Sequence, residues 1–278
     1  MDTEGLLEKG DREPTIVKAL RALSALLDEL GPFFEKPRLL NYKGIPVQRH
    51  VNRDDRLLCY LKCVRCISTL NASVVLLKAG YVQEAYALCR IADEVETDVF
   101  FMAMPHDDGK PSVDQKRLFD EFFQEELERP DDATSSLPRD RVSREKIHAA
   151  VSRYPVRDMN PHDFGMILNS IHKVMSGFVH GAYVHIMEMY GGSPAKFHVC
   201  GVNELPHRLI ECESQLANNV YRGILAVRAV AIRVEAKAID AALKALATSF
   251  AEETGCVSGD IKATMKRIKD RQKAADQN

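Results

Sequence analysis

The sequence predicts an all-α protein, a single helical bundle with a central αα-hairpin and two further long helices. Three observations favour this fold class: apolar residues recur at helical spacing, no segment shows convincing strand alternation, and no repeat period is visible. Hydrophobic residues make up 45% and charged residues 28% of the 278, which is ordinary for a chain that buries a sizeable core.

The first half of the chain contains the predicted hairpin. Residues 20–30 form a short amphipathic helix that ends at Gly31, and a loop is expected after it. Residues 54–79 and 81–104 form two long helices joined by a very tight turn at Gly80. Apolar residues cover much of the circumference of both, as expected for the central helices of a bundle.

Three further helices have recognisable starts. Ser112 begins a capping box for a helix to about Glu128, and a polar loop follows to Asp140. Ser143 caps a short helix to Arg153. Asn160 precedes a proline, which predicts the start of a helix that continues to residue 190.

The last third predicts a short extended piece at residues 196–200 and one long helix at residues 206–253, with a bend at Gly223. We divide the chain into an N-terminal helix and loop (1–53), the helical bundle (54–253) and a basic C-terminal tail (254–278), which is expected to be a frayed helix.

Charge and cysteine content limit the classes of partner. The formal net charge is −2, so nucleic acid or a membrane would need a local patch. The acidic N-terminus lacks a signal-peptide pattern, and no apolar run approaches the ~18 residues that span a bilayer. Seven irregularly spaced cysteines do not suggest a disulfide framework. We expect a cytoplasmic protein with free thiols and without membrane association or cofactor.

Polar side chains gather on one side of the helix predicted at residues 160–190. At ~100° per residue, five of them lie within roughly 60° of one another: His162, Asn169, Lys173, Ser176 and His180. Gly165, Gly177 and Gly181 also lie within this helix, where each costs ~1 kcal/mol relative to Ala. Such glycines favour close approach of another helix or a ligand. The alternative is that the polar residues form a solvated face.

The spacing of three of these residues suggests a chemistry. Ser176 and His180 are one turn apart, so their side chains could share a hydrogen bond, and Lys173 could hold an anion nearby. That set suits general acid–base catalysis on a phosphate or acyl group. A serine-hydrolase triad is not expected, because the sequence has neither a nucleophile elbow nor an evident carboxylate to orient the histidine.

Two segments together resemble the HEPN-like helical families, in particular an uncharacterised bacterial branch. That branch has E-A-x-x-L-x-R-x-x-x-E after a small turn and S-x-x-x-H-G on a later helix. This chain matches those motifs between roughly residues 55 and 190, within LNASVVLLKAGYVQEAYALCRIADEVETDVFF (70–101) and HKVMSGFVHG (172–181). The matching residues are Glu84, Ala85, Leu88, Arg90, Glu94, Ser176, His180 and Gly181.

The resemblance implies a function. Many HEPN proteins are metal-independent ribonucleases or toxins, in which two protomers form a groove and an Arg-x(4–6)-His pair acts on the RNA 2′-hydroxyl and phosphate. It implies a homodimer that acts on RNA or a nucleotide, in a bacterial defence or toxin system, with His180 as the proton-transfer residue. Lys173 stands where the arginine is expected, a departure that keeps the charge but loses the bidentate fork.

Literal matches to the Arg-x(4–6)-His motif also occur from Arg157 to His162 and from Arg141 to His148. Their number is about what chance gives. Arg90 and Glu94, one turn apart, form either a local ion pair or a pair that reaches the cleft of His180. We take His180, Ser176, Lys173 and Arg90 as candidate catalytic residues, and as weaker substrate-binding candidates Glu94, Asn169, Arg157 and His162.

Other groupings favour structural roles. Four cysteines of the predicted hairpin are flanked by apolar residues, which favours buried thiols over metal ligands: Cys59, Cys63, Cys66 and Cys89. The basic stretch at residues 139–157 is either a solvated face or a place for RNA phosphates. The main alternative function is a non-catalytic helical interaction or dimerisation module, whose glycines, Gly177 among them, serve dimer packing. Metal-dependent hydrolysis is less favoured, because no His and carboxylate set clusters in the sequence.

Overall fold

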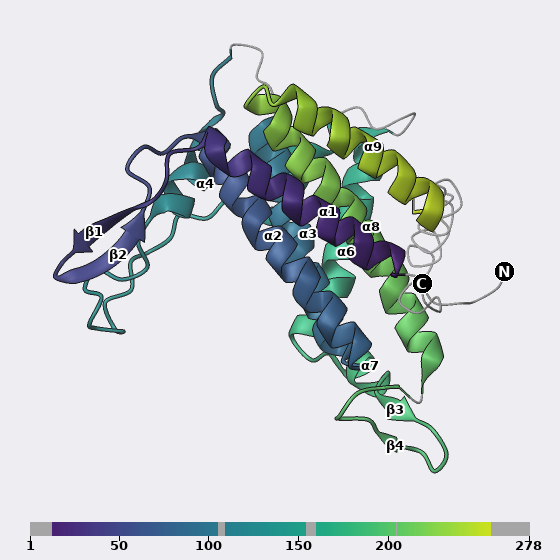
Figure 1. The fold of residues 1–278 in the computed structure, drawn as a ribbon. Coiled ribbons are helices and arrows are strands. Elements are labelled where there is room, and N and C mark those ends of the chain that lie inside the picture. Colours follow the sequence, from purple (N-terminus) through teal and green to yellow (C-terminus); the bar gives the residue numbers. More distant parts are fainter. Residues whose placement is uncertain (1–12, 105–108, 154–159, 204, 257–278) are drawn as a thin grey trace.

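The computed structural model describes residues 13–104, 109–153, 160–203 and 205–256 (Figure 1). The predicted all-α fold class is confirmed, since helices dominate and only two short β-hairpins accompany them in these ranges. The predicted tail beyond residue 256 lies outside the described residues.

The predicted hairpin is the centre of the bundle. α2 (Asp55–Lys78) and α3 (Val82–Ala103) lie side by side, within a residue or two of their predicted bounds. The Asp54 side chain caps α2 by accepting a hydrogen bond from the Leu57 amide at 2.8 Å. Gly80 turns the chain with φ +82°, a conformation that a glycine adopts without strain.

Three more helices complete the main core: α1 (Thr15–Leu30), α8 (Pro206–Arg233) and α9 (Lys237–Thr254). α8 packs against both helices of the hairpin, and α1 lies across α2, α8 and α9 (Figure 1). The largest fully buried side chains come from all of these layers and include Leu20, Leu58, Leu70, Leu216, Ile224 and Phe250. Their burial supplies the main stabilising free energy of the fold.

The prediction of one helix over residues 206–253 is wrong, because the chain reverses between α8 and α9. Glu235 adopts φ +58°, and the Ala236 amide bonds the Ala231 carbonyl oxygen at 2.9 Å, which closes the end of α8. Gly223, the predicted bend, stays inside α8. A Cβ there would lie 3.1 Å from Leu70 Cδ1, so this glycine lets α8 approach α2 closely.

The loop expected after the first helix is instead a β-hairpin, β1 (Arg38–Tyr42) paired with β2 (Ile45–Arg49). Lys43 and Gly44 both have positive φ, as a two-residue hairpin turn requires. Most of the hairpin residues are exposed, so the strands carry no apolar alternation to reveal them. The hairpin projects from the bundle beside α4 (Val113–Phe123) (Figure 1).

Two of the remaining helices pack on α3. The capping box at Ser112 is confirmed, although α4 ends before the predicted Glu128. α5 (Arg144–Val151) and α6 (Pro161–Val179) pack on α3 and on each other. After α6 come α7 (Tyr183–Met187) and a small hairpin of β3 (Tyr190–Gly191) and β4 (Lys196–Phe197), at the opposite end from β1 and β2 (Figure 1).

By length and composition alone, α2 is long and apolar enough to cross a membrane. This differs from the expectation that no apolar run approaches the length of a membrane span. Of the window that qualifies, 44% is buried inside the bundle. Core helices pass the same test, so this property is weak evidence for a membrane span.

Candidate functional site

The helix predicted at residues 160–190 ends early, at Val179, and this correction changes the setting of His180. Gly181 adopts φ +60°, and the Ala182 amide donates to the Gly177 carbonyl oxygen at 2.9 Å, so the chain leaves the helix there. His180 is the C-cap residue of α6 and is exposed. The start of α6 is as predicted, with the Asn160 side chain accepting from the His162 amide at 2.8 Å.

The polar residues of α6 separate into an exposed set and a half-buried set. His162, Lys173 and His180 are exposed, whereas Ser176 and Asn169 are half-buried. Within the described parts of the chain, no side-chain hydrogen bond joins Ser176 to His180; the contact between them is the backbone bond from the His180 amide, at 3.1 Å. The other weak candidate, Arg157, lies outside the described residues.

Arg90 contacts a different histidine from the one expected. Its Nη2 lies 2.8 Å from Nε2 of His172 on α6 and 2.7 Å from Oε1 of Glu94. The predicted ion pair of Arg90 with Glu94 is therefore confirmed. A direct contact of Arg90 with His180 is not among the contacts of the described residues. Arg90 is 8% exposed, so this guanidinium belongs to the interior of the α3–α6 contact.

His148 on α5 completes this cluster. Its Nδ1 lies 2.7 Å from Oδ1 of Asn169, and its ring meets the His172 ring edge to face at a centroid distance of 5.3 Å. The sequence argument missed both histidines as site residues. His172 could have been found because it lies one turn before Ser176 on the same side of α6. We call Arg90, Glu94, His148, Asn169 and His172 the arginine–histidine cluster.

The hydrogen bonds fix the protonation of His172. An arginine only donates, so Nε2 of His172 must accept from Arg90, and the ring proton lies on Nδ1. Burial is the main cause that lowers the pKa of His172, and the positive charge of Arg90 and the neighbouring His148 lower it further, against Glu94 and Asp93. His172 is therefore neutral at neutral pH.

Gly177 provides room inside the protein, which differs from its expected use in dimer packing. A Cβ on it would lie 2.4 Å from Cδ2 of His185 on α7. The His185 ring stacks on Phe178 at 3.8 Å between centroids, and Phe178 stacks on Tyr86 of α3 at 4.2 Å. The missing side chain thus lets α7 fold back on α6 within one chain.

We expect Gly177→Ala to destabilise this end of the bundle by about 1–3 kcal/mol, because the added methyl displaces the buried His185 ring from its stack. Urea unfolding followed by circular dichroism measures the loss. Gly165→Ala, on the same helix, is the matched control for the methyl group, since its Cβ would meet only the Ser152 side chain, 3.3 Å from Oγ. A Gly177→Ala variant as stable as wild type would show that α7 does not depend on this contact.

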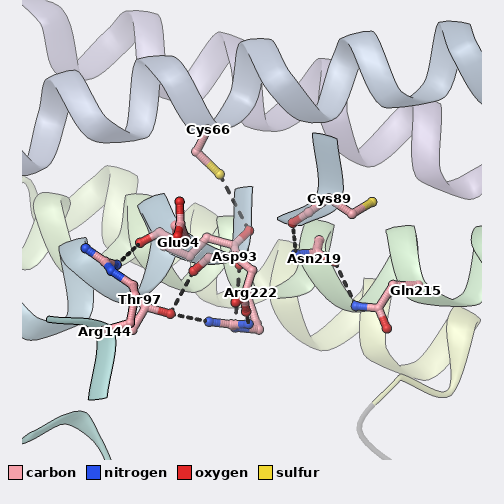
Figure 2. Close-up of polar contacts among 10 residues, drawn as sticks. Cys66, Cys89, Asp93, Glu94, Thr97, Arg144, Gln215, Asn219 and Arg222 are labelled. Carbon is pink, nitrogen blue, oxygen red and sulfur yellow. Dashed lines mark hydrogen bonds and ion pairs between the residues drawn. The ribbon is translucent and has the colours of Figure 1, made fainter. Parts of the chain in front are cut away.

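α3 also carries buried carboxylates that face its other neighbours. Arg222 of α8 pairs with Asp93 and donates to Thr97 Oγ1 at 3.0 Å (Figure 2). Its Nε lies 3.5 Å from Oε2 of Glu96. Asp98 pairs at 2.7 Å with both Lys62 and Arg144. These pairs join α3 to α8, α2 and α5, a structural use that the sequence did not reveal.

The basic stretch expected to meet RNA phosphates mostly holds carboxylates of this chain. Arg144 binds Asp98, Arg139 lies 2.8 Å from Glu121, and Lys146 lies 3.5 Å from Asp114. The described part of this stretch therefore offers few uncommitted charges to a phosphate backbone.

The cysteine prediction is confirmed for the hairpin, where all four thiols are free and buried. Burial raises the pKa of Cys59 to about 12, so this thiol stays protonated. Cys66 Sγ lies 3.5 Å from Oε1 of Glu96. Among the described residues, no three His, Cys, Asp or Glu side chains gather where they could hold a metal ion.

A cleft of 880 Å³ lies between the β1–β2 hairpin, α2 and the end of α4, away from every candidate residue of the sequence analysis. Its cations are engaged within the protein. Arg49 makes two 2.8 Å bonds to Glu125, and Lys62, bound to Asp98, lies over the Phe122 ring at 5.3 Å. The cleft is therefore separate from the candidate site on α6.

Compared with protein-family models, with curated proteins and with solved structures, the chain gives no match in any of the three comparisons.

Proposed function

We propose that this protein is a HEPN-like helical protein that acts on RNA or a nucleotide as a homodimer, with His180 as its proton-transfer residue. The observation that carries the proposal is the setting of His180 and Lys173. Both are exposed, and exposed apolar side chains of α6 and α7 accompany them along the chain, including Val174 at 58%, Tyr183 at 76% and Val184 at 62%.

Such a surface suits a site made between two copies. Single exposed apolar residues are common, but a continuous group of them around titratable side chains is typical of an interaction surface. A second copy placed on this face would bury the apolar residues and bring two His180 rings toward one groove. Because a two-fold interface uses the same patch twice, one chain supplies both halves of the site.

Each candidate residue has a separate role in the proposed reaction. His180, in contact with solvent, transfers a proton at neutral pH, and Lys173 on the preceding turns of α6 holds the phosphate. Ser176 lies between them as a hydroxyl partner for either group. Arg90 is bound to Glu94 and His172, so it acts by positioning α6. Asn169 likewise holds His148, and the exposed His162 remains a candidate for RNA contact. Arg157, which lies outside the described residues, remains a candidate too.

We expect purified wild type to cleave a mixed RNA pool in EDTA, and His180→Ala to lose roughly 10²–10⁴-fold of that activity, because a proton-transfer group is removed. Denaturing gels with timed samples measure the rate. His207→Ala is the control, since it removes an exposed histidine from the start of α8. A folded His180→Ala variant that cleaves RNA as fast as His207→Ala would refute the assignment of His180.

The second candidate function is a non-catalytic dimerisation module, which the same exposed apolar face favours. Under both functions we expect Val184→Glu to convert a dimer into a monomer, because it places a charge among the exposed apolar residues. Light scattering after size exclusion, with the exposed Val75→Glu on α2 as control, gives the mass. Dimers without RNA cleavage would favour the module, and a monomeric wild type would contradict both functions.

A further inference from the structure

We propose that the cleft between the β1–β2 hairpin, α2 and the end of α4 binds a small organic acid in its anionic form, with an apolar body. The cleft volume of 880 Å³ lies within the range of about 300–1,000 Å³ that is usual for small-molecule sites. The candidate residues of α6 do not line this cleft. The proposal therefore depends neither on RNA cleavage nor on dimerisation.

Apolar side chains form part of the wall of the cleft. Phe122 and Phe123, at the end of α4, both line it, and their rings meet edge to face at a centroid distance of 4.9 Å. Val47 of β2 and Leu61 of α2 line it as well. All four side chains are half-buried, so they keep apolar surface in contact with water. The apolar body of a ligand would cover this surface, and that burial favours binding.

Each carboxylate that lines the cleft lies close to an arginine of the same wall. Glu125 accepts two bonds from Arg49, both at 2.8 Å. Glu121 lies 2.8 Å and Glu126 lies 3.3 Å from Arg139. A cationic ligand would therefore have to compete with an arginine that is already in place for every one of these carboxylates.

Arg53, in contrast, is a cation of the cleft wall without a carboxylate of its own. Its Nε and Nη1 donate to two backbone carbonyl oxygens, at 3.3 and 3.1 Å, and no carboxylate of the described residues lies at ion-pair distance from it. Its charge contributes to the lowered pKa of Glu125, but that carboxylate is held by Arg49. The exposed guanidinium of Arg53 thus keeps its positive charge available to a ligand.

Lys62 adds a second positive charge that is only partly neutralised. Its Nζ lies 2.7 Å from Asp98, and Arg144 lies 2.7 Å from the same aspartate, so one carboxylate serves two cations. The side chain of Lys62 is 17% exposed and lines the cleft. The wall therefore carries more positive than negative charge, and this excess favours an anion.

The two cations lie next to the apolar wall. The guanidinium of Arg53 lies 5.2 Å from the ring centroid of Phe123, and the ammonium of Lys62 lies 5.3 Å from that of Phe122. Because these two rings contact each other, positive charge and apolar surface alternate along one wall. Charges attract more strongly beside apolar surface, where water screens them less. An apolar body that carries one anionic group matches this arrangement.

The test uses two competitors that share one naphthyl body and carry opposite charges, naphthoate and naphthylmethylammonium. Each displaces a neutral fluorescent reporter, phenylnaphthylamine, from the full-length protein. Arg53→Gln removes one cation of the wall, and Lys62→Met removes the other while Asp98 keeps Arg144. Arg65→Gln is the control, since it removes an exposed arginine of α2 that does not line the cleft. Circular dichroism checks that each variant is folded.

We expect naphthoate to displace the reporter at a concentration roughly tenfold or more below that of naphthylmethylammonium. Arg53→Gln and Lys62→Met should each raise the naphthoate concentration required by roughly fivefold or more, without weakening the binding of the neutral reporter. Arg65→Gln should match wild type in both measurements.

A naphthoate that displaces the reporter from wild type no better than naphthylmethylammonium, or not at all, would overturn the proposal. This comparison needs no variant, so it holds even where Arg53→Gln or Lys62→Met fails to fold. Equal naphthoate affinities of Arg53→Gln and Arg65→Gln would overturn it too. Since His180 does not line the cleft, His180→Ala should bind naphthoate as wild type does, whatever its RNA activity.

Discussion

Replacing Asp93 by Asn is expected to lower the free energy of unfolding by about 3 kcal/mol, because it leaves Arg222 buried without its nearest counter-ion. Asp93 keeps 4% of its side-chain surface, and Arg222 keeps 25%, which places the cost at the lower end for a broken buried pair. Glu96, the other carboxyl beside Arg222, has a pKa raised to about 8 by burial and is mostly protonated at neutral pH. Asp93 is one of the charges that raise this pKa, so its removal lets Glu96 ionise more readily and offsets part of the cost.

Urea unfolding at neutral pH, followed by circular dichroism, measures this loss. Asp140→Asn is the matched control, since it breaks an arginine–aspartate pair whose carboxylate is 76% exposed, where solvent screening leaves little stability to lose. If Asp93→Asn proved no more costly than Asp140→Asn, the α3–α8 ion pair would not be a main stabilising contact. A loss that shrinks at higher pH is also expected, because Glu96 then ionises and pairs with Arg222.

The helical periodicity was sufficient to predict the fold class and the α2–α3 hairpin, because apolar spacing and the Gly80 turn are local features. The helix ends were harder. Three glycines lie in residues 160–190, and only Gly181 has a positive φ and ends α6. The other reversal is at Glu235, a residue type that gives no sign of a positive φ in the sequence.

In the candidate site, contacts between residues close in sequence were predictable, and contacts between distant residues were not. The ion pair of Arg90 with Glu94 was predictable, because the two residues are one turn apart. The contact of Arg90 with His172 joins residues 82 apart in sequence, and depends on how α3 packs against α6. His148 lies on a third helix, α5. One sequence contains no periodicity that would pair these three residues, so the cluster became visible only in three dimensions.

Glu96→Gln is expected to change the pH dependence of stability more than any exposed carboxyl substitution. Glu96 is 0% exposed, and burial raises its pKa from 4.5 to about 8, against the lowering effect of Arg222. The folded protein therefore holds a proton that the unfolded chain releases. Stability from this group is fully present below pH 4.5 and is lost as the pH rises toward 8, by on the order of 5 kcal/mol in total.

A glutamine has nearly the same shape and cannot ionise, so the difference between the two proteins isolates this one group. The free energy of unfolding of wild type minus that of Glu96→Gln should fall as the pH rises from about 4.5 to about 8 and then become constant. Glu125→Gln is the control with the opposite sign. Its hydrogen bond from Arg49 lowers the pKa of Glu125, so wild type should gain stability over that variant as the pH rises through the acidic range.

A difference for Glu96→Gln that does not change with pH would mean that Glu96 is ionised and paired with Arg222 throughout. Asp93 would then share the guanidinium with a second full charge, and Asp93→Asn should cost correspondingly less.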